Sequence, residues 1–300
     1  MLNWDEFQKQ SSAQWMSSAD KSSRGKYQAE ALKYDVEGDF SVSVFVTERP
    51  DSTSPVDAAE TASCVKILVT SAIEANELAR TFLEYSPDAI LFEIHGEVDL
   101  KVLLRDIYID MISVFLEVHG DAQKVKEQVD EYICAHYTDR SVHLEVMGQG
   151  TIKLSSQMKF KERLNMFNLW SSRCNSGLIL ELEIKNDFIA QIAELRAMRR
   201  LWKKHGHQPE NLTILAHCNA TTDGDISPMI VESYQVLSTI MGGSDYVVTT
   251  FIEDKERTRL GINMMHIFRN ESRMTQVIDT VAGAYLPEVL TEEMVHSVID

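Results

Sequence analysis

Cysteine is scarce in this sequence and lacks the spacing that metal or redox chemistry uses. The four cysteines lie far apart and form no CxxC pair; they are Cys64, Cys134, Cys174 and Cys218. Zinc ribbons, thioredoxin-like motifs and disulfide frameworks all need closely spaced cysteines in defined numbers. We therefore expect reduced, mostly buried thiols, as in a cytosolic protein.

Long apolar runs are also absent. No stretch approaches the ~20 apolar residues that span a bilayer. Residues 1–20 are polar and carry no apolar segment followed by a cleavage site, as a signal peptide would. The sequence therefore predicts a cytoplasmic protein with no membrane contact.

Positive charge is in deficit, with 29 Lys and Arg against 46 Asp and Glu, for a formal net charge of −17. So acidic a surface repels nucleic-acid phosphate and anionic lipid, which excludes both as general partners. It also repels free coenzyme A, a polyanion, unless a local basic pocket intervenes. The densest basic cluster, within residues 196–204, is interpreted as a solvated or ion-paired helix face.

Several motifs of common enzymes are missing. The sequence contains no GxSxG nucleophile turn, no GxGxxG or GxxxxGKS phosphate loop and no HExxH metal motif. Nucleophilic hydrolases, nucleotide-binding enzymes and zincin-type proteases are therefore disfavoured.

The composition is that of a folded α/β protein, with 44% hydrophobic and 25% charged residues. A stretch rich in Ser, Thr, Asp and Pro over residues 50–62 predicts a linker. We therefore divide the chain into an N-terminal helical and strand extension with its linker (1–62), including a strand over 40–47, and a main domain (63–300).

Apolar runs of strand length alternate with helical segments through the main domain. Strands are expected at 64–70, 88–94, 112–118, 141–146, 177–184, 211–217 and 245–250, with a weak eighth at 151–154. Helices are expected at 73–85, 100–108, 121–137, 188–204, 228–241 and 258–268. Buried strands separated by helices predict a parallel sheet with right-handed crossovers. Eight of them fit an α/β fold, a (β/α)8 TIM-type barrel that is possibly degenerate, with an open doubly wound sheet as the alternative.

Three strand ends repeat one pattern, and a fourth lacks its glycine. They read Phe92-Glu93-Ile94-His95-Gly96, Leu116-Glu117-Val118-His119-Gly120, Leu144-Glu145-Val146-Met147-Gly148 and Leu182-Glu183-Ile184-Lys185. Because side chains alternate along a strand, apolar residues under the helices would turn the four glutamates into the barrel.

The same strand ends suggest a site. His95, His119 and His217 end strands at the edge where barrels carry their functional residues. With Glu93, Glu117 and Glu145 they could bind a divalent metal or form an acid-base pair. The alternative, which we favour, is a set of hydrated or mutually hydrogen-bonded side chains in a barrel without a ligand.

The C-terminal part resembles the methylmalonyl-CoA mutase family through four ordered motifs. Residues 192–202 resemble the family's IAKxRAARxLW helix and contain Arg196, Arg199 and Trp202; residues 240–249 resemble its GGxDxxxV segment and contain Gly242 and Gly243. Asn263, Glu271 and Ser272 have the spacing of its RxARNxQxILxEES helix, and Asp279, Gly283 and Tyr285 that of its DPAGGSYYxExLT stretch.

The resemblance implies a barrel that, in catalytic relatives, threads an acyl-CoA along its axis past small polar side chains and faces a cobalamin domain. Here the DxHxxG cobalamin motif, the TYR-containing arm and a counterpart of the substrate histidine are not found. Residues 147–177 also look shortened where the family has a strand and a helix. Gly242-Gly243 is read as a helix stop before the next strand.

These departures suggest a non-catalytic, small-subunit-like chain, inactive alone, in a family whose reaction is an isomerisation of methylmalonyl-CoA and succinyl-CoA. The expected partner is a mutase large subunit in a heterodimer, or a second copy in a homodimer. Adenosylcobalamin is expected only in that large subunit, and no metal or acyl-CoA is expected on this chain. The alternatives are a stand-alone barrel enzyme using the Glu/His site and, least favoured, an active acyl-CoA mutase.

Overall fold

Eight parallel strands form one sheet in a computed structural model of the chain, which describes residues 10–28, 31–46, 56, 60–137, 142–148, 151–219, 227–249 and 255–299. The strand order is β6-β5-β4-β3-β10-β9-β8-β7. The strands are β3 (Ala62–Val69), β4 (Ala89–Ile94), β5 (Ser113–Val118), β6 (Leu144–Met147), β7 (Thr151–Leu154), β8 (Leu178–Glu183), β9 (Leu212–Cys218) and β10 (Tyr246–Thr249). The first of these strands in the chain, β3, pairs with the last, β10, and the sheet curls into a nearly closed barrel. This confirms the predicted TIM-type fold.

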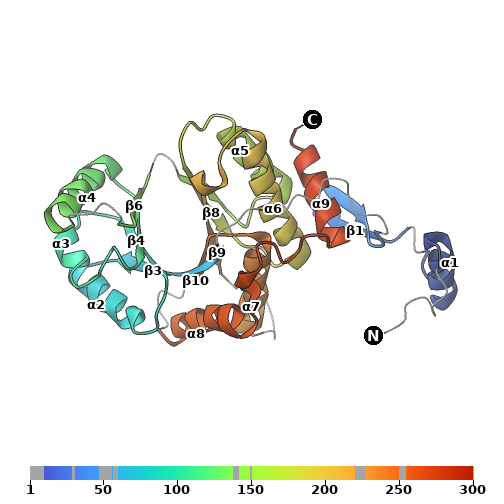
Figure 1. Cartoon of the computed structure of the whole chain (residues 1–300), viewed down its shortest axis with the longest axis horizontal. Coiled ribbons are helices and arrows are strands. Elements are labelled where there is room, and N and C mark those ends of the chain that lie inside the picture. The colour runs from blue at the N-terminus through green and yellow to red at the C-terminus, as the bar shows by residue number, and fades with distance from the viewer. Residues whose placement is uncertain are drawn as a thin grey trace.

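Helices surround the sheet, as Figure 1 shows. They are α2 (Ala72–Leu83), α3 (Leu100–Leu103), α4 (Ala122–His136), α5 (Phe160–Ser171), α6 (Phe188–Lys204), α7 (Pro228–Gly242), α8 (Lys255–His266) and α9 (Tyr285–His296). Aspartates begin three of them: Asp99, Asp121 and Asp187 each accept a backbone N–H of the first turn of α3, α4 and α6. The helix predicted over 100–108 is only four residues long, and α5 and α9 were not predicted.

The barrel has one open seam, between β6 and β7, which are the two ends of the sheet. Residues 148–150 alone connect these strands, too few for the helix that joins other neighbouring parallel strands. That residues 147–177 are shortened relative to the family stays a prediction. The strand β7 and the helix α5 are both present there, and the missing element is a crossover helix before β7.

The N-terminal part supplies a hairpin, β1 (Lys33–Val36) and β2 (Phe40–Ser43), paired antiparallel. Its Val36, Phe40 and Val42 are buried in one apolar cluster with side chains of α6 and α9. The helix α1 (Ser12–Ser22) buries none of its residues and lies at the far end of the molecule (Figure 1). The predicted strand at 40–47 is thus shorter and has a partner, while most of the predicted linker lies outside the described residues.

Two apolar clusters pack the helices against the outer face of the sheet, one around β3 to β5 and one around β7 to β9. Among the described residues, no helix is both long and apolar enough to cross a membrane. All four cysteines are free; Cys64 and Cys218 are buried, whereas Cys134 is exposed.

Candidate functional site

The inward faces of the strands form an apolar layer and, above it, a charged layer. The apolar layer contains Cys64, Ala89, Leu91, Phe115, Met147, Leu215 and Val248, all buried. Two residues further along the same strands, toward their carboxyl ends, stand Lys66, Glu93, Glu117 and His217. The barrel interior is therefore filled by side chains, with its ionisable groups gathered near the mouth.

Lys66 joins the glutamates of two neighbouring strands. The register of β4 and β5 places Glu93 directly beside Glu117. The Lys66 Nζ on β3 lies 2.7 Å from Glu93 Oε2 and 2.8 Å from Glu117 Oε2. Two adjacent carboxylates would repel one another, and the ammonium group between them offsets that repulsion. The predicted inward orientation of Glu93 and Glu117 is confirmed.

Lys153 extends the same pairing across the open seam, between the two ends of the sheet. Its Nζ, on β7, forms an ion pair with Glu117 and lies 3.0 Å from Glu181 Oε1 on β8. Glu181 Oε2 in turn lies 3.1 Å from His217 Nε2 on β9. We call Lys66, Glu93, Glu117, Lys153, Glu181 and His217 the axial charge network. It holds three carboxylates and two ammonium groups, so little net charge remains.

The carboxyl pKa values reflect this pairing. Burial alone would raise the pKa of Glu117, but hydrogen bonds from Lys153 and Lys66 outweigh it and lower the pKa to about 2. Burial likewise opposes ionisation of Glu93, and its hydrogen bonds with Lys66 and His95 lower its pKa below the usual value. Burial would lower the pKa of Lys66, yet the two glutamates raise it. Lys66, Glu93 and Glu117 are therefore ionised at neutral pH.

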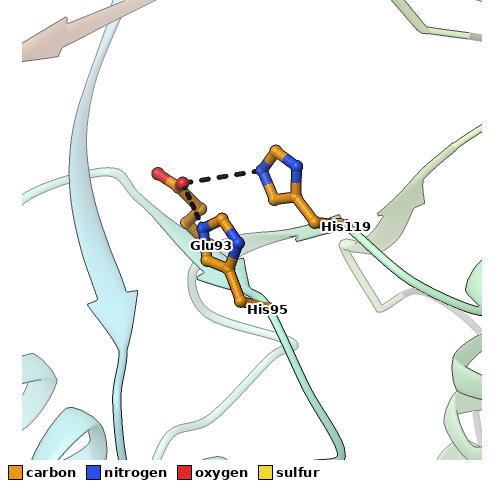
Figure 2. A group of neighbouring side chains, drawn as sticks. All are labelled: Glu93, His95 and His119. Carbon is orange, nitrogen blue, oxygen red and sulfur yellow. Dashed lines mark hydrogen bonds and ion pairs between the residues drawn. The ribbon is translucent and has the colours of Figure 1, made fainter.

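Two histidines extend the network to the solvent. The Nε2 atoms of His95 and His119 lie 2.6 and 3.5 Å from the same atom, Glu93 Oε1, as Figure 2 shows. His119 Nε2 also lies 2.9 Å from Glu117 Oε1. The two rings stack with centroids 4.2 Å apart and planes 2° from parallel. Their side chains are 53% and 39% exposed, so they stand at the mouth rather than in the core.

Glu145 and Glu183 do not join this group in the way the repeat suggested. None of the described hydrogen bonds or ion pairs links Glu145 to the other predicted site residues. Glu145 lines the cleft along the seam, where partial desolvation raises its pKa. Glu183 accepts hydrogen bonds from Ser155 Oγ and from Ser156 N and Oγ, at 2.8 to 3.0 Å. Glu183 therefore fastens the end of β8 to the turn after β7.

Sequence reasoning missed three members of the network, Lys66, Lys153 and Glu181. A signal existed for each: both lysines interrupt short apolar strand runs, and Glu181 shares the alternation of Glu183. The distance between β5 and β7 could not be predicted from the sequence, because it depends on how far the barrel closes.

Two clefts lie near the carboxyl ends of β4 to β6. One, of about 970 Å³, is walled by residues 96–101 and by one face of α4 from Lys124 to Ala135. The other, of about 900 Å³, follows the seam and is walled by Glu145, Gly148, Thr151 and residues 177–179. No residue of the axial charge network lines either cleft.

Comparison with known proteins finds a similarity in the second half of the chain. Residues 157–300 match the family model described as methylmalonyl-CoA mutase. These residues are similar to the methylmalonyl-CoA mutase family. The match covers β8 to β10 and the helices α5 to α9, and so includes all four motifs that carry the resemblance.

Individual relatives in this family are distant. The chain is 25% identical over 126 residues to the 2-hydroxyisobutanoyl-CoA mutase large subunit of Aquincola tertiaricarbonis, covering 36% of this chain and 22% of that protein. It is 26% identical over 124 residues to the methylmalonyl-CoA mutase of Cereibacter sphaeroides, covering 36% and 18%. It is 28% identical over 125 residues to the mitochondrial methylmalonyl-CoA mutase of Homo sapiens, covering 36% and 17%. The matched stretch spans about a fifth of these relatives.

The mutase-family motifs around Arg196 hold helices together. Arg196, fully buried on α6, lies 2.6 Å from Asp279 Oδ1 and 2.7 Å from Glu288 Oε1 on α9. Glu288 also pairs with Arg200 at 2.5 Å and accepts the backbone N–H of Gly283. Of the two expected forms of this face, solvated or ion-paired, Arg196 has the ion-paired one, and partners more than 80 residues away bury it.

The other motif residues of α6 and α7 have similar structural roles. Arg199 donates to the Gly243 carbonyl and lies 2.7 Å from Asp245 Oδ2, while Trp202 donates to the Gln208 carbonyl. Gly243 ends α7 with φ 84°, in the left-handed region, which agrees with the predicted helix stop. A Cβ on Gly242 would lie 2.6 Å from a Leu195 side-chain carbon, so this glycine allows α6 and α7 to approach.

The remaining family positions are more exposed. Asn263 is half-buried on α8, and Tyr285 begins α9 with 42% of its surface exposed. Glu271 ends a short π-helical turn, after which Ser272 donates its N–H to the Ile267 carbonyl. None of the described motif residues enters the axial charge network.

Adenosylcobalamin chemistry does not fit the described interior. The resemblance implies a reaction inside an open barrel mouth, and here paired ionic side chains fill the mouth above a buried apolar layer.

Proposed function

We propose that this chain is a non-catalytic, small-subunit-like member of the methylmalonyl-CoA mutase family. It pairs with a large subunit that carries adenosylcobalamin and interconverts methylmalonyl-CoA and succinyl-CoA. The chain itself binds neither the cobalamin nor the thioester, and contributes a scaffold that stabilises its partner.

The filled barrel axis carries this proposal. The resemblance implies that working relatives thread a long thioester past small polar side chains. In this chain the corresponding space holds Leu91, Leu215 and Val248, each fully buried, beneath the axial charge network. A pantetheine arm would have to displace both layers.

Electrostatics supports the same proposal. Opening the network would separate Glu117 from Lys66, two largely buried side chains, and breaking a buried ion pair by removing one partner costs about 3–5 kcal/mol. The net charge of −17 adds a long-range repulsion against a polyanionic coenzyme. The densest basic cluster does not offset it, because Arg196, Arg199 and Arg200 are paired with acidic side chains.

The retained motifs support a scaffold role. The ion pairs of Arg196 and Arg199 fix α6 against α9 and against the turn before β10, and neither touches the barrel mouth. A chain that keeps these contacts retains the outer shape of the family barrel. A chain of this shape can associate with a homologous subunit without catalysing a reaction.

Co-purification tests the proposal. The tagged chain would be expressed together with a cobalamin-binding large subunit from the same genome, and the eluate analysed by size-exclusion chromatography with light scattering. We expect a stoichiometric heteromer, with mutase activity in fractions that contain both chains and none in the chain alone. An untagged chain in the same cells controls for capture by the resin.

Recovery of homomers alone from cells that contain both proteins would contradict the pairing. Mutase activity of the purified chain supplied with adenosylcobalamin would contradict the non-catalytic assignment. The two results are independent, so each part of the proposal can fail separately.

A further inference from the structure

The structure brings together three side chains that can ligate a metal, at the carboxyl ends of β4 and β5. Glu93, His95 and His119 each offer one ligand atom, and these atoms all lie within 4.8 Å of one another. We propose that they form a binding site for a divalent first-row transition metal ion. This site goes beyond the scaffold role and does not depend on it.

The strand register explains why these residues meet. Glu93 pairs with Glu117 across β4 and β5, and each strand continues for two residues to a histidine. The histidines therefore leave neighbouring strands at the same level and on the same face, with stacked rings. Both Nε2 atoms point toward Glu93 Oε1 (Figure 2).

The distances suit one ion. An ion bonded at about 2.1 Å to three ligands separates their atoms by about 3.0 Å in octahedral and about 3.4 Å in tetrahedral geometry. The His119 Nε2 to Glu93 Oε1 distance, 3.5 Å, already lies near these values. The His95 distance, 2.6 Å, must lengthen by about half an ångström. An imidazole binds a metal in the plane of its ring, so at least one of the two stacked, exposed rings must also rotate before both Nε2 atoms can bind one ion.

Neighbouring charges hold the carboxylate in a suitable position. Lys66 contacts Glu93 through Oε2, which leaves Oε1 directed at the two imidazoles. This arrangement favours coordination through one oxygen. Lys66 also opposes a cation electrostatically, but Glu117, 2.9 Å from His119, adds a negative charge on the other side.

The site is open on one side. Gly96 and Gly120, the residues after the two histidines, line the cleft of about 970 Å³. Three protein ligands with accessible positions are typical of metal sites that keep a water or a substrate, whereas structural zinc sites are closed by four. Two imidazoles and one carboxylate suit Zn²⁺, Fe²⁺ or Co²⁺ better than Mg²⁺ or Ca²⁺.

Titration of the purified, chelator-treated protein tests this site. Isothermal titration calorimetry with Zn²⁺ should give one equivalent bound, and Co²⁺ should give visible absorption bands at the same stoichiometry. The variants His95→Ala, His119→Ala and Glu93→Gln should each weaken binding at least tenfold. His136→Ala, on the exposed end of α4, should bind as the unchanged protein does.

Circular dichroism establishes that each variant is folded, and Glu93→Gln keeps the shape of the side chain if an alanine variant fails to fold. Absence of stoichiometric binding by the unchanged protein would overturn the proposal. Equal binding by the unchanged protein and by Glu93→Gln, His95→Ala or His119→Ala would also overturn it, because the metal would then lie elsewhere.

Discussion

Replacing Lys66 with methionine should destabilise the barrel from its centre. Methionine keeps most of the side chain's length and apolar volume but removes the ammonium group that lies 2.7 Å from Glu93 and 2.8 Å from Glu117. The Lys66→Met variant therefore leaves two adjacent carboxylates without the cation that separates them. The expected effect is a loss of folding stability with no change of fold.

The magnitude follows from the burial of these groups. The Lys66 side chain is 13% exposed and that of Glu117 only 5%. Removing one partner of a buried ion pair costs about 3–5 kcal/mol. Glu117 retains Lys153 and Glu93 retains His95, so we expect about 2–3 kcal/mol for Lys66→Met.

Urea denaturation followed by circular dichroism measures this loss, with EDTA present so that bound metal does not contribute. A double-mutant cycle with Glu117→Gln should give a coupling energy of about 1–2 kcal/mol, because the double variant removes both charges together. Lys124→Met is the matched control, since Lys124 forms its ion pair with Glu97 on the exposed surface and should cause no measurable change.

A stability change in Lys66→Met as small as that of the Lys124→Met control would refute this reasoning. Strict additivity in the cycle would refute it as well. Either result would mean that the carboxylates are solvated and that the axial charge network does not stabilise the barrel.

Three further substitutions test other parts of the structure. Burial raises the pKa of Glu232 to about 7 from 4.5, so the native carboxyl keeps a proton that the unfolded chain has released. Stability should therefore fall as the pH rises from about 4.5 to 7, and Glu232→Gln should recover up to about 3 kcal/mol at pH 8 and nothing at pH 4. Arg163→Met should cost about 3–5 kcal/mol in urea denaturation, because Arg163 pairs with Glu194 at 2.6 Å and neither side chain is exposed. Gly242→Ala should cost about 1–3 kcal/mol in thermal denaturation, because its Cβ would lie 2.6 Å from a Leu195 carbon.

Each of these three predictions has a result that would contradict it. A pH-independent difference between Glu232→Gln and the unchanged protein would show that this carboxyl does not titrate differently on folding. A neutral Arg163→Met would contradict a desolvated ion pair, and an unchanged melting temperature in Gly242→Ala would contradict close packing of α6 on α7.

The sheet was largely predictable because its strands are nearly continuous apolar runs with regular spacing. The Glu and His repeat also predicted which side chains of β4 and β5 meet, since period-two alternation fixes their face. The weak strand at 151–154 could be placed, but the missing crossover before it could not, because a three-residue connection resembles an ordinary turn.

The pairing of charges was less accessible to sequence reasoning. Lys153 reaches Glu117 only because the curl of the sheet brings β7, at one end, close to β5 near the other end. Arg196 is buried only because Asp279 and Glu288 fold back onto α6. Both arrangements join residues far apart in the chain. The helix α5 was missed for a local reason, since its apolar residues are spread around several faces.

Calorimetric titration of the purified chain with methylmalonyl-CoA tests most directly whether the barrel axis excludes a thioester. The reasoning above predicts no binding heat up to millimolar thioester, because the axis is occupied by paired ions and buried apolar side chains. Saturable binding at micromolar concentration, lost when Leu91 is replaced by a larger side chain, would contradict it and would establish an open axial channel.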